Sequence, residues 1–562
     1  MPTIKPFLVA VLALGIALTT AVETATPRFF ADDPLQREPE TQDASRAESR
    51  DTDLFYDFIY NSFVTPRRER HRVRAGNVNT ADEVPDSSWF TNRALREAHD
   101  TAQLALGPNT LGGTRIDLHA AGPVTVVKAK TDGAAPGFVA RCANGETWYV
   151  TLDPKGYEEA ATGALMVASR LFWGLGYNVP EQYLAAIRPE LLQIGATARV
   201  PTMSGKGRPM TRQDLDAVFA RAARSADGSY RVVASRQVPG RVIGRFAYEG
   251  TRNDDPNDIV PHEHRRELRA LQVFGAWTNL VDIKANNTLD ALVLRDGRGI
   301  VKHYLQDVGS AFGIGANGPH DYDEGFEHVY QGDTLVRRLF SFGLYLSPWQ
   351  TEAKYEKHTA IGRFEAAAFE PREWKPRLPV PALLNLDDAD AFWAARRVAA
   401  FTDQMIRAAV ATAEYSAAEA ERYLAQVLIE RRNRVARAYL AGVGSIVNPV
   451  LGDAALSFAD AAVDSGAAGR ATGGYRATWS RFDNTTGLAA ILGETAAAGT
   501  RLAAPDTLPA ADGTYVQVSI QAIEGGSALP TVATFLRADD AWTLVGVSRT
   551  DATAPARREL TE

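Results

Sequence analysis

The segment NLVDIKANNT, residues 279–288, carries three carboxamides, a lysine and a carboxylate between two apolar stretches. A helix or a strand could have continued there, so this polar run indicates a loop with a task of its own. Asp282 and Asn287 are separated by four residues, and Lys284 lies between them. The segments on either side are therefore interpreted outward from this loop.

The same side chains also have a plainer interpretation. Asp and Asn commonly form turns and satisfy backbone groups where a helix meets a strand. In that case Asp282 and Asn287 are turn formers, and Asp307 only terminates a strand. The residues of the loop alone leave both interpretations open.

Regular elements are expected on both sides of the loop. Residues 262–278 have the spacing of an amphipathic helix, and Asp307-Val308-Gly309 ends a strand. Ser416 with Glu419 forms a capping box that opens a long helix through Leu440. We also expect a hairpin of 288–294 and 300–306, strands at 124–130, 138–142 and 147–152, helices at 158–173 and 213–223, a hairpin of 230–238 and 241–248 around Pro239-Gly240, mostly helices over 330–445, and strands at 515–520, 531–536 and 542–547.

This order of elements resembles the two-lobed fold of protein kinases. Asp282 and Asn287 match the kinase catalytic-loop spacing Asp-x-x-x-x-Asn, and Lys284 falls where serine/threonine kinases place lysine. Asp307-Val308-Gly309 resembles the Asp-Phe-Gly motif. The resemblance covers about residues 120–445 and is to the atypical branch, the HipA-like and Golgi casein-kinase-like secreted enzymes. It is diverged in the small lobe.

The resemblance implies a phosphotransferase that uses ATP and Mg²⁺ on an unknown protein or small-molecule acceptor. Asp282 would orient the attacking hydroxyl and accept its proton, and Lys284 would lie against the transferred phosphate. Asn287 and Asp307 would bind nucleotide and metal through hard oxygen ligands. The catalytic residues are thus expected to be Asp282 and Lys284, and the metal ligands Asn287 and Asp307.

The expected small lobe departs from the kinase pattern at two positions. Strand 147–152 has Thr151 where a lysine would bind the nucleotide phosphates, and the next helix has Leu165 where its glutamate partner is expected. Lys130 is a candidate for binding the nucleotide instead, although a solvated surface position is its plainer interpretation. The alternative function is therefore a catalytically inactive pseudokinase that serves as an envelope binding or scaffold protein.

We expect an α+β protein with a two-lobed kinase-like fold, an N-terminal segment that wraps around it and a small C-terminal β-rich domain. The expected ranges are 1–25 for a signal peptide, 26–119 for the N-terminal extension, 120–260 for the small lobe with insertions, 261–445 for the helical large lobe and 450–562 for the β-rich domain.

The start of the sequence, the cysteine count and the net charge limit the compartments and the partners that we expect for this protein. Lys5, an apolar stretch over 7–18 and small residues after it have the order of a secretory signal peptide, and no later segment is apolar enough to span a membrane. A single cysteine in an exported chain of 562 residues favours a bacterial periplasm or the exterior. The net charge of −7 argues against a nucleic-acid partner.

Two other polar clusters invite a metal interpretation. His262-Glu263-His264 lacks the H-E-x-x-H spacing of zinc enzymes, and a helix N-terminus is its plainer explanation. Residues 254–258 gather hard oxygens that could bind calcium, but they lack the spacing of an EF-hand loop. A polar turn before a helix accounts for that segment equally well.

Overall fold

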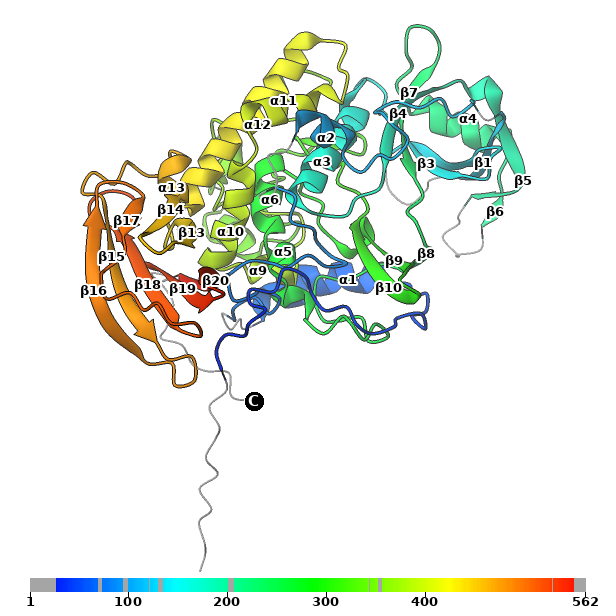
Figure 1. The fold of residues 1–562 in the computed structure, drawn as a ribbon. Helices are drawn as coiled ribbons and strands as arrows, with labels where there is room; N and C mark the ends of the chain where they lie inside the picture. The colour runs from blue at the N-terminus through cyan, green and yellow to red at the C-terminus, as the bar shows by residue number, and fades with distance from the viewer. Residues whose placement is uncertain are drawn as a thin grey trace, which may run out of the picture.

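The computed structural model is an α+β protein with two lobes, an N-terminal segment wrapped around them and a C-terminal β-rich unit, which confirms the expected fold class (Figure 1). The predicted signal peptide and Lys130 lie outside the residues that the structure describes. No helix among the described residues is long and apolar enough to cross a membrane. The structure describes residues 27–68, 73–94, 100–120, 122–129, 135–200, 207–342, 344–351, 356–527 and 529–549.

The small lobe is built on a seven-stranded sheet in the order β4-β7-β3-β2-β1-β5-β6. Its first three strands are those that the sequence predicts, and the turn between β2 and β3 contains Gly145 at a φ of 86°. Trp148 and Val150 of β3 share one core with Phe219 of helix α4. The bounds are β1 Val124–Ala129, β2 Gly137–Arg141, β3 Thr147–Leu152, β4 Gln182–Ile187, β5 Leu192–Val200, β6 Arg208–Pro209, β7 Tyr230–Arg236 and α4 Arg212–Ala220.

Helix α3, Ala160–Leu175, packs on the other face of this sheet. Leu184 of β4 and Val233 of β7 belong to the same core as α3, which continues into the large lobe. The helix ends at Gly176, as predicted, where φ is 130°. A Cβ on this glycine would lie 2.3 Å from the ring of Phe90, so the wrapping segment is packed directly onto the end of the helix.

The hairpin predicted around Pro239-Gly240 is wrong. β7 pairs with β3 and β4, whereas β8, Arg241–Gly244, pairs with β9 in a separate three-stranded sheet. The Pro-Gly turn is therefore the connection between the two sheets. Gly240 is needed there because its φ is 90° and a Cβ would lie 2.4 Å from the carbonyl oxygen of Leu292.

The continuous amphipathic helix predicted over 262–278 is also wrong. Arg265 is extended and interrupts it, and the arginines that seemed to form its polar face are buried. Arg266 and Arg269 bind the two oxygens of the buried Asp390 at 2.8 and 3.0 Å. Buried ion pairs have the same sequence pattern as a solvated helix face, which explains the error. The observed elements are a 3-10 turn His262–His264, α5 Arg266–Arg269 and α6 Leu271–Thr278.

Helices α6, α10, α11 and α12 pack together as the large lobe. Trp277 of α6 donates from Nε1 to the carbonyl oxygen of Leu428 at 3.0 Å. The predicted capping box is wrong, because the backbone N–H and hydroxyl of Ser416 donate to Glu159 beside α3. That contact joins the two lobes. The remaining helices are α7 Gly332–Phe340, α8 Pro348–Thr351, α9 Pro381–Leu384, α10 Asp388–Ala399, α11 Asp403–Ala411 and α12 Ala418–Tyr439.

The hairpin predicted after the polar loop is present. It consists of the strands β9, Thr288–Arg295, and β10, Arg298–Leu305. Its turn has Asp296 at a φ of 51° and Gly297 at 76°, the two positive values that a tight hairpin turn requires. The hairpin brings the end of β10 back beside the start of β9.

The C-terminal unit contains two sheets in the orders β13-β14-β17 and β16-β15-β18-β19-β20. Trp479 is fully buried and belongs to the core that the two sheets share. The domain boundary at residue 450 stays a prediction. The bounds are β13 Ile446–Leu451, β14 Ala455–Asp460, α13 Ala461–Asp464, β15 Tyr475–Phe482, β16 Ala489–Ala497, β17 Arg501–Ala503, β18 Tyr515–Ala522, β19 Thr531–Ala538 and β20 Ala541–Arg549.

The wrapping segment contacts every other part of the molecule. Phe29 stacks on the ring of Tyr515 in the β-rich unit, and the Trp89 ring stacks on His303 of β10 at 3.5 Å. Asp82 pairs with the buried Arg266 at 3.0 Å. The segment has two short α-helices, α1, Leu54–Ile59, and α2, Thr101–Leu106. Helix α1 continues as a π-turn, Tyr60–Val64, and a 3-10 turn, Thr65–Arg67.

Candidate functional site

Asp282, Asn287 and Asp307 line one small pocket, of about 230 Å³, together with the buried Tyr248. The hairpin β9–β10 makes this possible, since it returns the chain from Asn287 to Asp307. Three side chains that the sequence singled out are thus brought together. The 230 Å³ includes space open to solvent, and the cavity itself measures about 10 Å³, which is room for a single water molecule or metal ion.

The loop that carries Asp282 is held in place from both sides. Helix α6 ends at Asn279, whose φ of 55° turns the chain and whose Oδ1 accepts a hydrogen bond from Trp374 Nε1 at 2.9 Å. Two residues later, the carbonyl oxygen of Val281 accepts a hydrogen bond from the backbone N–H of Arg377 at 2.9 Å. The backbone N–H of Val281 donates to the carbonyl oxygen of Ser310 at 3.3 Å. The main chain on either side of Asp282 is therefore fixed, and its carboxylate remains about one-third exposed.

Asn287 joins the two motifs. Its Nδ2 donates to the main-chain oxygen of Asp282 at 2.7 Å and to Oδ2 of Asp282 at 3.0 Å. Its main-chain oxygen accepts from the backbone N–H groups of Gln306 and Asp307. Because the amide nitrogen is committed to Asp282, the amide oxygen is the atom left to act as a ligand.

Lys284 pairs with Asp282, and the structure adds a residue that the sequence did not point to. Lys284 Nζ lies 2.8 Å from Asp282 Oδ1. Asp57 of the wrapping helix α1 accepts a hydrogen bond from the backbone N–H of Ala285. Burial raises the pKa of Asp57, and the Ala285 bond, the Asn61 side chain and the charge of Lys284 lower it less than burial raises it. No local pattern links residue 57 to the loop, so only the fold reveals this contact.

Asp307 is oriented by its own turn. The backbone N–H of Gly309 donates to Asp307 Oδ1 at 2.9 Å. Leu165 of α3 lies beside this turn, and its Cδ1 is 3.3 Å from the position that a Cβ would take on Gly309. The position where the resemblance expects a glutamate therefore faces the Asp-x-Gly turn, but it carries an apolar side chain.

Thr151 faces the same region. It pairs with Val233 of β7, whose side chain belongs to the core around α3, so Thr151 lies on the sheet face that α3 covers. A lysine is thus missing from the position that the resemblance assigns to it. Lys130, the proposed substitute, lies outside the described residues, and its role stays a prediction.

Another set of contacts ties α3 to the sheet. The two oxygens of Asp153, just after β3, accept from the backbone N–H and the hydroxyl of Thr162, both at 2.8 Å. Arg231 of β7 donates to the same hydroxyl at 2.9 Å. Burial raises the pKa of Asp153 to about 6, against the lowering effect of the Thr162 bonds and of Arg231. These contacts do not reach the pocket, so they hold α3 in place without replacing a phosphate-binding lysine.

Negative charge predominates around the pocket. Burial raises the pKa of Glu324 to about 7, Arg377 opposes this, and the charges of Asp321, Asp323 and Asp282 add to it. The pKa of Tyr248 is raised by burial and by the charges of Asp57 and Asp282. A site with this excess of carboxylates favours a cation.

The donor set at the pocket fits magnesium. Within the described ranges, no group of three or more His, Cys, Asp or Glu residues is arranged to hold a metal ion by itself. Asn287 and Asp307 supply an amide oxygen and a carboxylate at one pocket. Mg²⁺ is commonly bound by one or two carboxylates, with water and substrate phosphates completing its coordination, so this small set is sufficient.

The two other clusters considered for metals have structural roles. His262 is buried, and its ring nitrogens bond the carboxylate of Asp258 at 2.8 Å and the carbonyl oxygen of Ala247. Asp258 also accepts from the backbone N–H of Arg252, and Asp254 pairs with Arg252 at 3.0 Å. These carboxylates bond a histidine, an arginine and the backbone, which is the plainer interpretation.

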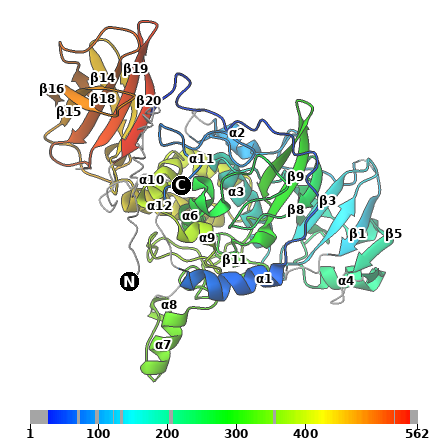
Figure 2. The same cartoon turned by 90° about the horizontal axis from the view of Figure 1, so that it is seen from below.

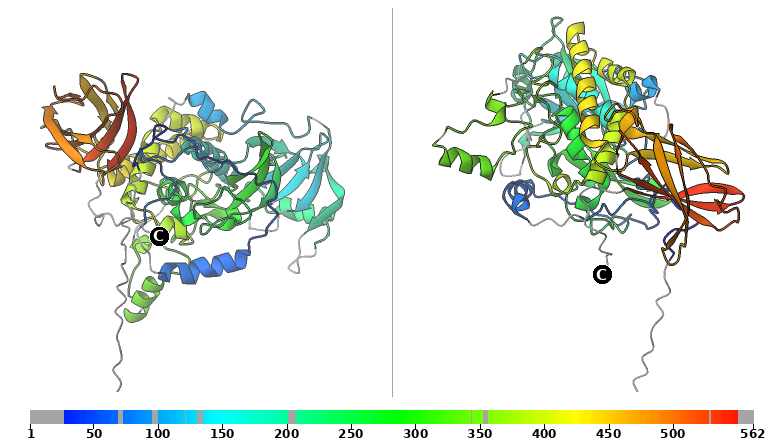
Figure 3. Two further views of the ribbon diagram at one scale, coloured as in Figure 1. Left: turned by 60° about the horizontal axis from the view of Figure 1, so that its bottom comes forward. Right: turned by 90° about the vertical axis from the view of Figure 1, so that its left-hand side faces the viewer.

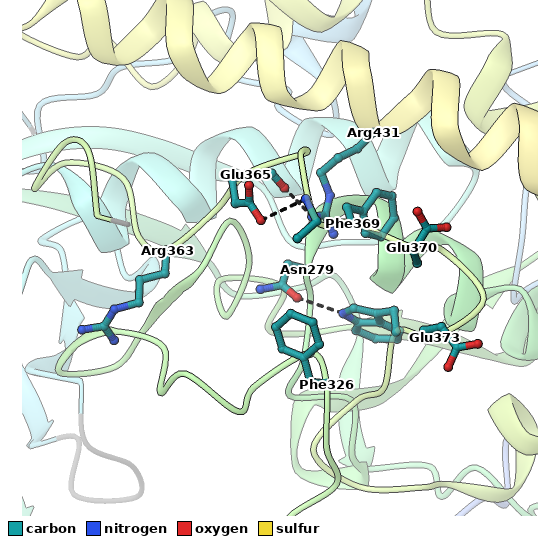
Figure 4. Close-up of a pocket in the computed structure, with 11 residues that line it drawn as sticks. Asn279, Phe326, Arg363, Glu365, Phe369, Glu370, Glu373 and Arg431 are labelled. Carbon is teal, nitrogen blue, oxygen red and sulfur yellow. Dashed lines mark hydrogen bonds between the residues drawn. The ribbon is translucent and has the colours of Figure 1, made fainter. Parts of the chain in front are cut away.

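A second pocket, of about 450 Å³, lies behind the loop at Asn279 (Figure 4). Figure 4 shows the bond from Trp374 to Asn279 and the buried Arg431 beside Phe369. Arg431 donates to the carbonyl oxygens of Ala276, Trp277 and Glu365. Because the guanidinium of Arg431 bonds main-chain oxygens, its role is to hold the end of α6 in place.

No family model matches the sequence, and no curated protein matches it. Among solved structures, the chain is similar to a Golgi casein kinase, with 9% identity and a TM-score of 0.30 over 72% of this chain and 94% of that one. It is also similar to the Golgi casein kinase with Mn/ADP bound, with 11% identity and a TM-score of 0.29 over 72% and 95% of the two chains. Both TM-scores are low, so the site is interpreted from its own side chains. The HipA-like part of the resemblance stays a prediction.

Proposed function

We propose that this protein is a kinase-like phosphotransferase that uses ATP and Mg²⁺. The observation that supports the proposal is the meeting of Asp282, Asn287 and Asp307 at one pocket across the β9–β10 hairpin. A hairpin brings its two ends together in any case, so the support comes from the side chains: a carboxamide and two carboxylates share one pocket, and Asp282 is about one-third exposed. The acceptor is an unknown protein or small molecule.

Each residue has a role that its contacts suit. Asn287 and Asp307 would hold Mg²⁺, which neutralises charge on the phosphate oxygens when bound. Asp282 is partly exposed and fixed by Asn287, so it can orient an acceptor hydroxyl and accept its proton. Lys284, 2.8 Å from Asp282, places a positive charge at the same opening.

A periplasmic or secreted location belongs to the same proposal. It is supported by the order of charged, apolar and small residues at the start of the sequence. Free ATP is scarce outside a bacterial cytoplasm, so an exported kinase needs an unusual donor or a different reaction on the same fold, such as nucleotidyl transfer. Any assay therefore needs more than one nucleoside triphosphate.

A second candidate function is a pseudokinase that binds or organises an envelope partner. Leu165 beside Gly309 and Thr151 on the facing strand favour it, because neither can bind phosphate by charge. The small volume of the pocket favours it too. Loss of catalysis would leave the fold and the hydrogen bonds of the loop unchanged.

The deciding experiment measures transfer of label from γ-labelled nucleotides, with Mg²⁺ or Mn²⁺, to the protein itself and to generic acceptors. Active protein should lose transfer by about a hundredfold or more in Asp282→Asn. Asp296→Asn, in the exposed turn of the same hairpin, should transfer like the wild type. No transfer with any nucleotide, or equal transfer in Asp282→Asn, would favour the pseudokinase.

A further inference from the structure

Two segments far apart in the sequence form one exposed apolar surface. Nearly half of the exposed large apolar side chains among the described residues fall within 54–64 and 330–346. The segments touch, since the ring of Phe63 lies 4.7 Å from that of Tyr330. Soluble proteins rarely leave so contiguous an apolar surface uncovered. We call the exposed apolar side chains of these two segments the apolar face.

The most exposed part of the apolar face is at the tip of α7. This helix extends away from the body of the molecule, on the side where α1 lies (Figures 2 and 3). Phe340, Phe342 and Leu344 are 78%, 95% and 85% exposed. Phe342 also has a φ of 52°, a conformation that is costly for an aromatic residue. The described part of the chain leaves these side chains uncovered, so a surface outside it is needed to cover them.

The charges of this segment identify the partner. Residues 334–351, TLVRRLFSFGLYLSPWQT, contain two arginines and no Asp or Glu. Arg337 lies over the ring of Tyr345, and Arg338 donates to Ser347 at 2.9 Å, so both are held beside the apolar tip. A short helix with apolar residues on one side and arginines on the other is typical of segments that lie in a membrane interface. Tyr and Trp are also enriched at that depth, and the segment has Tyr345 and Trp349.

We propose that the apolar face docks onto an anionic lipid bilayer, with the tip of α7 inserted among the headgroups and α1 lying against the surface. A projecting tip suits a deformable lipid surface better than a preformed protein groove. The sequence of 330–346 has a single acidic residue, Asp333, and Arg338 also pairs with Glu327 at 3.7 Å, so Arg337 is the arginine best placed to face anionic headgroups. The proposal concerns binding only and does not depend on phosphotransfer.

Docking would place the bilayer next to the candidate site. Helix α1 supplies exposed Phe55 and Tyr56 to the apolar face, and its Asp57 binds the backbone N–H of Ala285 in the loop. The loop is therefore one helix away from the docked surface. An acceptor that lies at the membrane would be within reach of Asp282.

The test is co-sedimentation of the purified protein with vesicles of phosphatidylcholine, with and without phosphatidylglycerol. The wild type should bind the anionic vesicles, more weakly at high salt. The triple variant, which combines Phe340→Ser, Phe342→Ser and Leu344→Ser, should bind the anionic vesicles at least about tenfold more weakly, because three inserting side chains are lost. These residues are exposed, so the variant should keep the wild-type unfolding temperature.

The matched control is Leu294→Ser, Leu488→Ser, Ile491→Ser, which removes three equally exposed apolar side chains elsewhere. It should bind vesicles like the wild type. Equal loss in both variants, or no binding of the wild type to either vesicle, would overturn the proposal. So would a wild-type dimer in analytical ultracentrifugation that the α7 variant converts to a monomer, since the face would then be an interface between two copies.

Discussion

Leu165 of α3 packs directly against Gly309 of the Asp-x-Gly turn, with its Cδ1 3.3 Å from the position that a Cβ would take on the glycine. This contact packs α3 directly against the candidate site. It also shows what is missing, because an apolar side chain occupies the position expected for a glutamate. The carboxylates and the amide that line the pocket come from the loop after α6 and from the turn after β10.

The pair Thr151 and Leu165 tests this arrangement through stability. Leu165→Glu should destabilise the fold by about 3 kcal/mol or more, because it buries an unpaired carboxylate. Adding Thr151→Lys should restore about 1–3 kcal/mol if the two positions face each other. The measurement is urea unfolding of both single variants and the double variant. A double variant that is no more stable than the sum of the single effects would show that the strand and helix do not oppose these positions.

Asn287 should matter for the loop even without a ligand. Asn287→Ala removes two hydrogen bonds to Asp282, so the free energy of unfolding should fall by about 1–2 kcal/mol in metal-free buffer. Asn286→Ala, at the neighbouring carboxamide, is the control and should change stability less. Equal effects of the two substitutions would contradict the assigned orientation of the Asn287 side chain.

Asp153 predicts a pH dependence of stability. Burial raises its pKa in the folded protein from the ordinary 3.8 to about 6, so the protonated form is favoured in the folded state. The stability linked to this group is then fully present below about pH 4 and is lost as the pH rises through about 6, by roughly 3 kcal/mol at most. Urea unfolding of the wild type and Asp153→Asn from about pH 4 to pH 7 checks this. The variant should lack that part of the wild-type slope, and parallel curves would show that Asp153 titrates normally.

Arg549 joins the β-rich unit to the rest of the molecule. Its side chain is 5% exposed, lies 3.4 Å from Asp82 of the wrapping segment and stacks over Phe392 of α10 at 4.6 Å. Arg549→Met keeps the apolar stem but leaves carboxylate charge without this partner, so unfolding should cost about 2–4 kcal/mol less. The exposed Arg476 provides the control, Arg476→Met, which should change stability little. Independent melting of the β-rich unit in the wild type would contradict the coupling.

Local patterns predicted the parts of the fold that neighbouring residues determine. The strands β1 to β3 follow alternating apolar residues, and the β9–β10 hairpin follows from its Asp296-Gly297 turn. Gly176 marks the end of α3 as expected. The convergence of Asn287 and Asp307 could be anticipated because a tight hairpin joins them, and hairpin geometry returns the chain to its starting point.

Features that depend on a distant partner were not predictable. Pro239-Gly240 has the sequence of a hairpin turn, yet β8 pairs with β9, which comes about 50 residues later. Ser416 has the spacing of a capping box, but Glu159 competes successfully for it. Asp57 reaches the loop only because the wrapping segment crosses it. In each case a tertiary contact outweighs the local preference.

Direct measurement of metal-dependent nucleotide binding tests the central claim, which is that Asn287 and Asp307 form one divalent-cation site beside Asp282. The measurement is calorimetry of the wild type, Asp307→Asn and the control Asp296→Asn with ATP or ADP, each with Mg²⁺, Mn²⁺ or chelator. The wild type and Asp296→Asn should bind nucleotide only when metal is present, and Asp307→Asn should lose that binding. Binding that is unchanged by chelator, or equal in Asp307→Asn and the wild type, would contradict the claim.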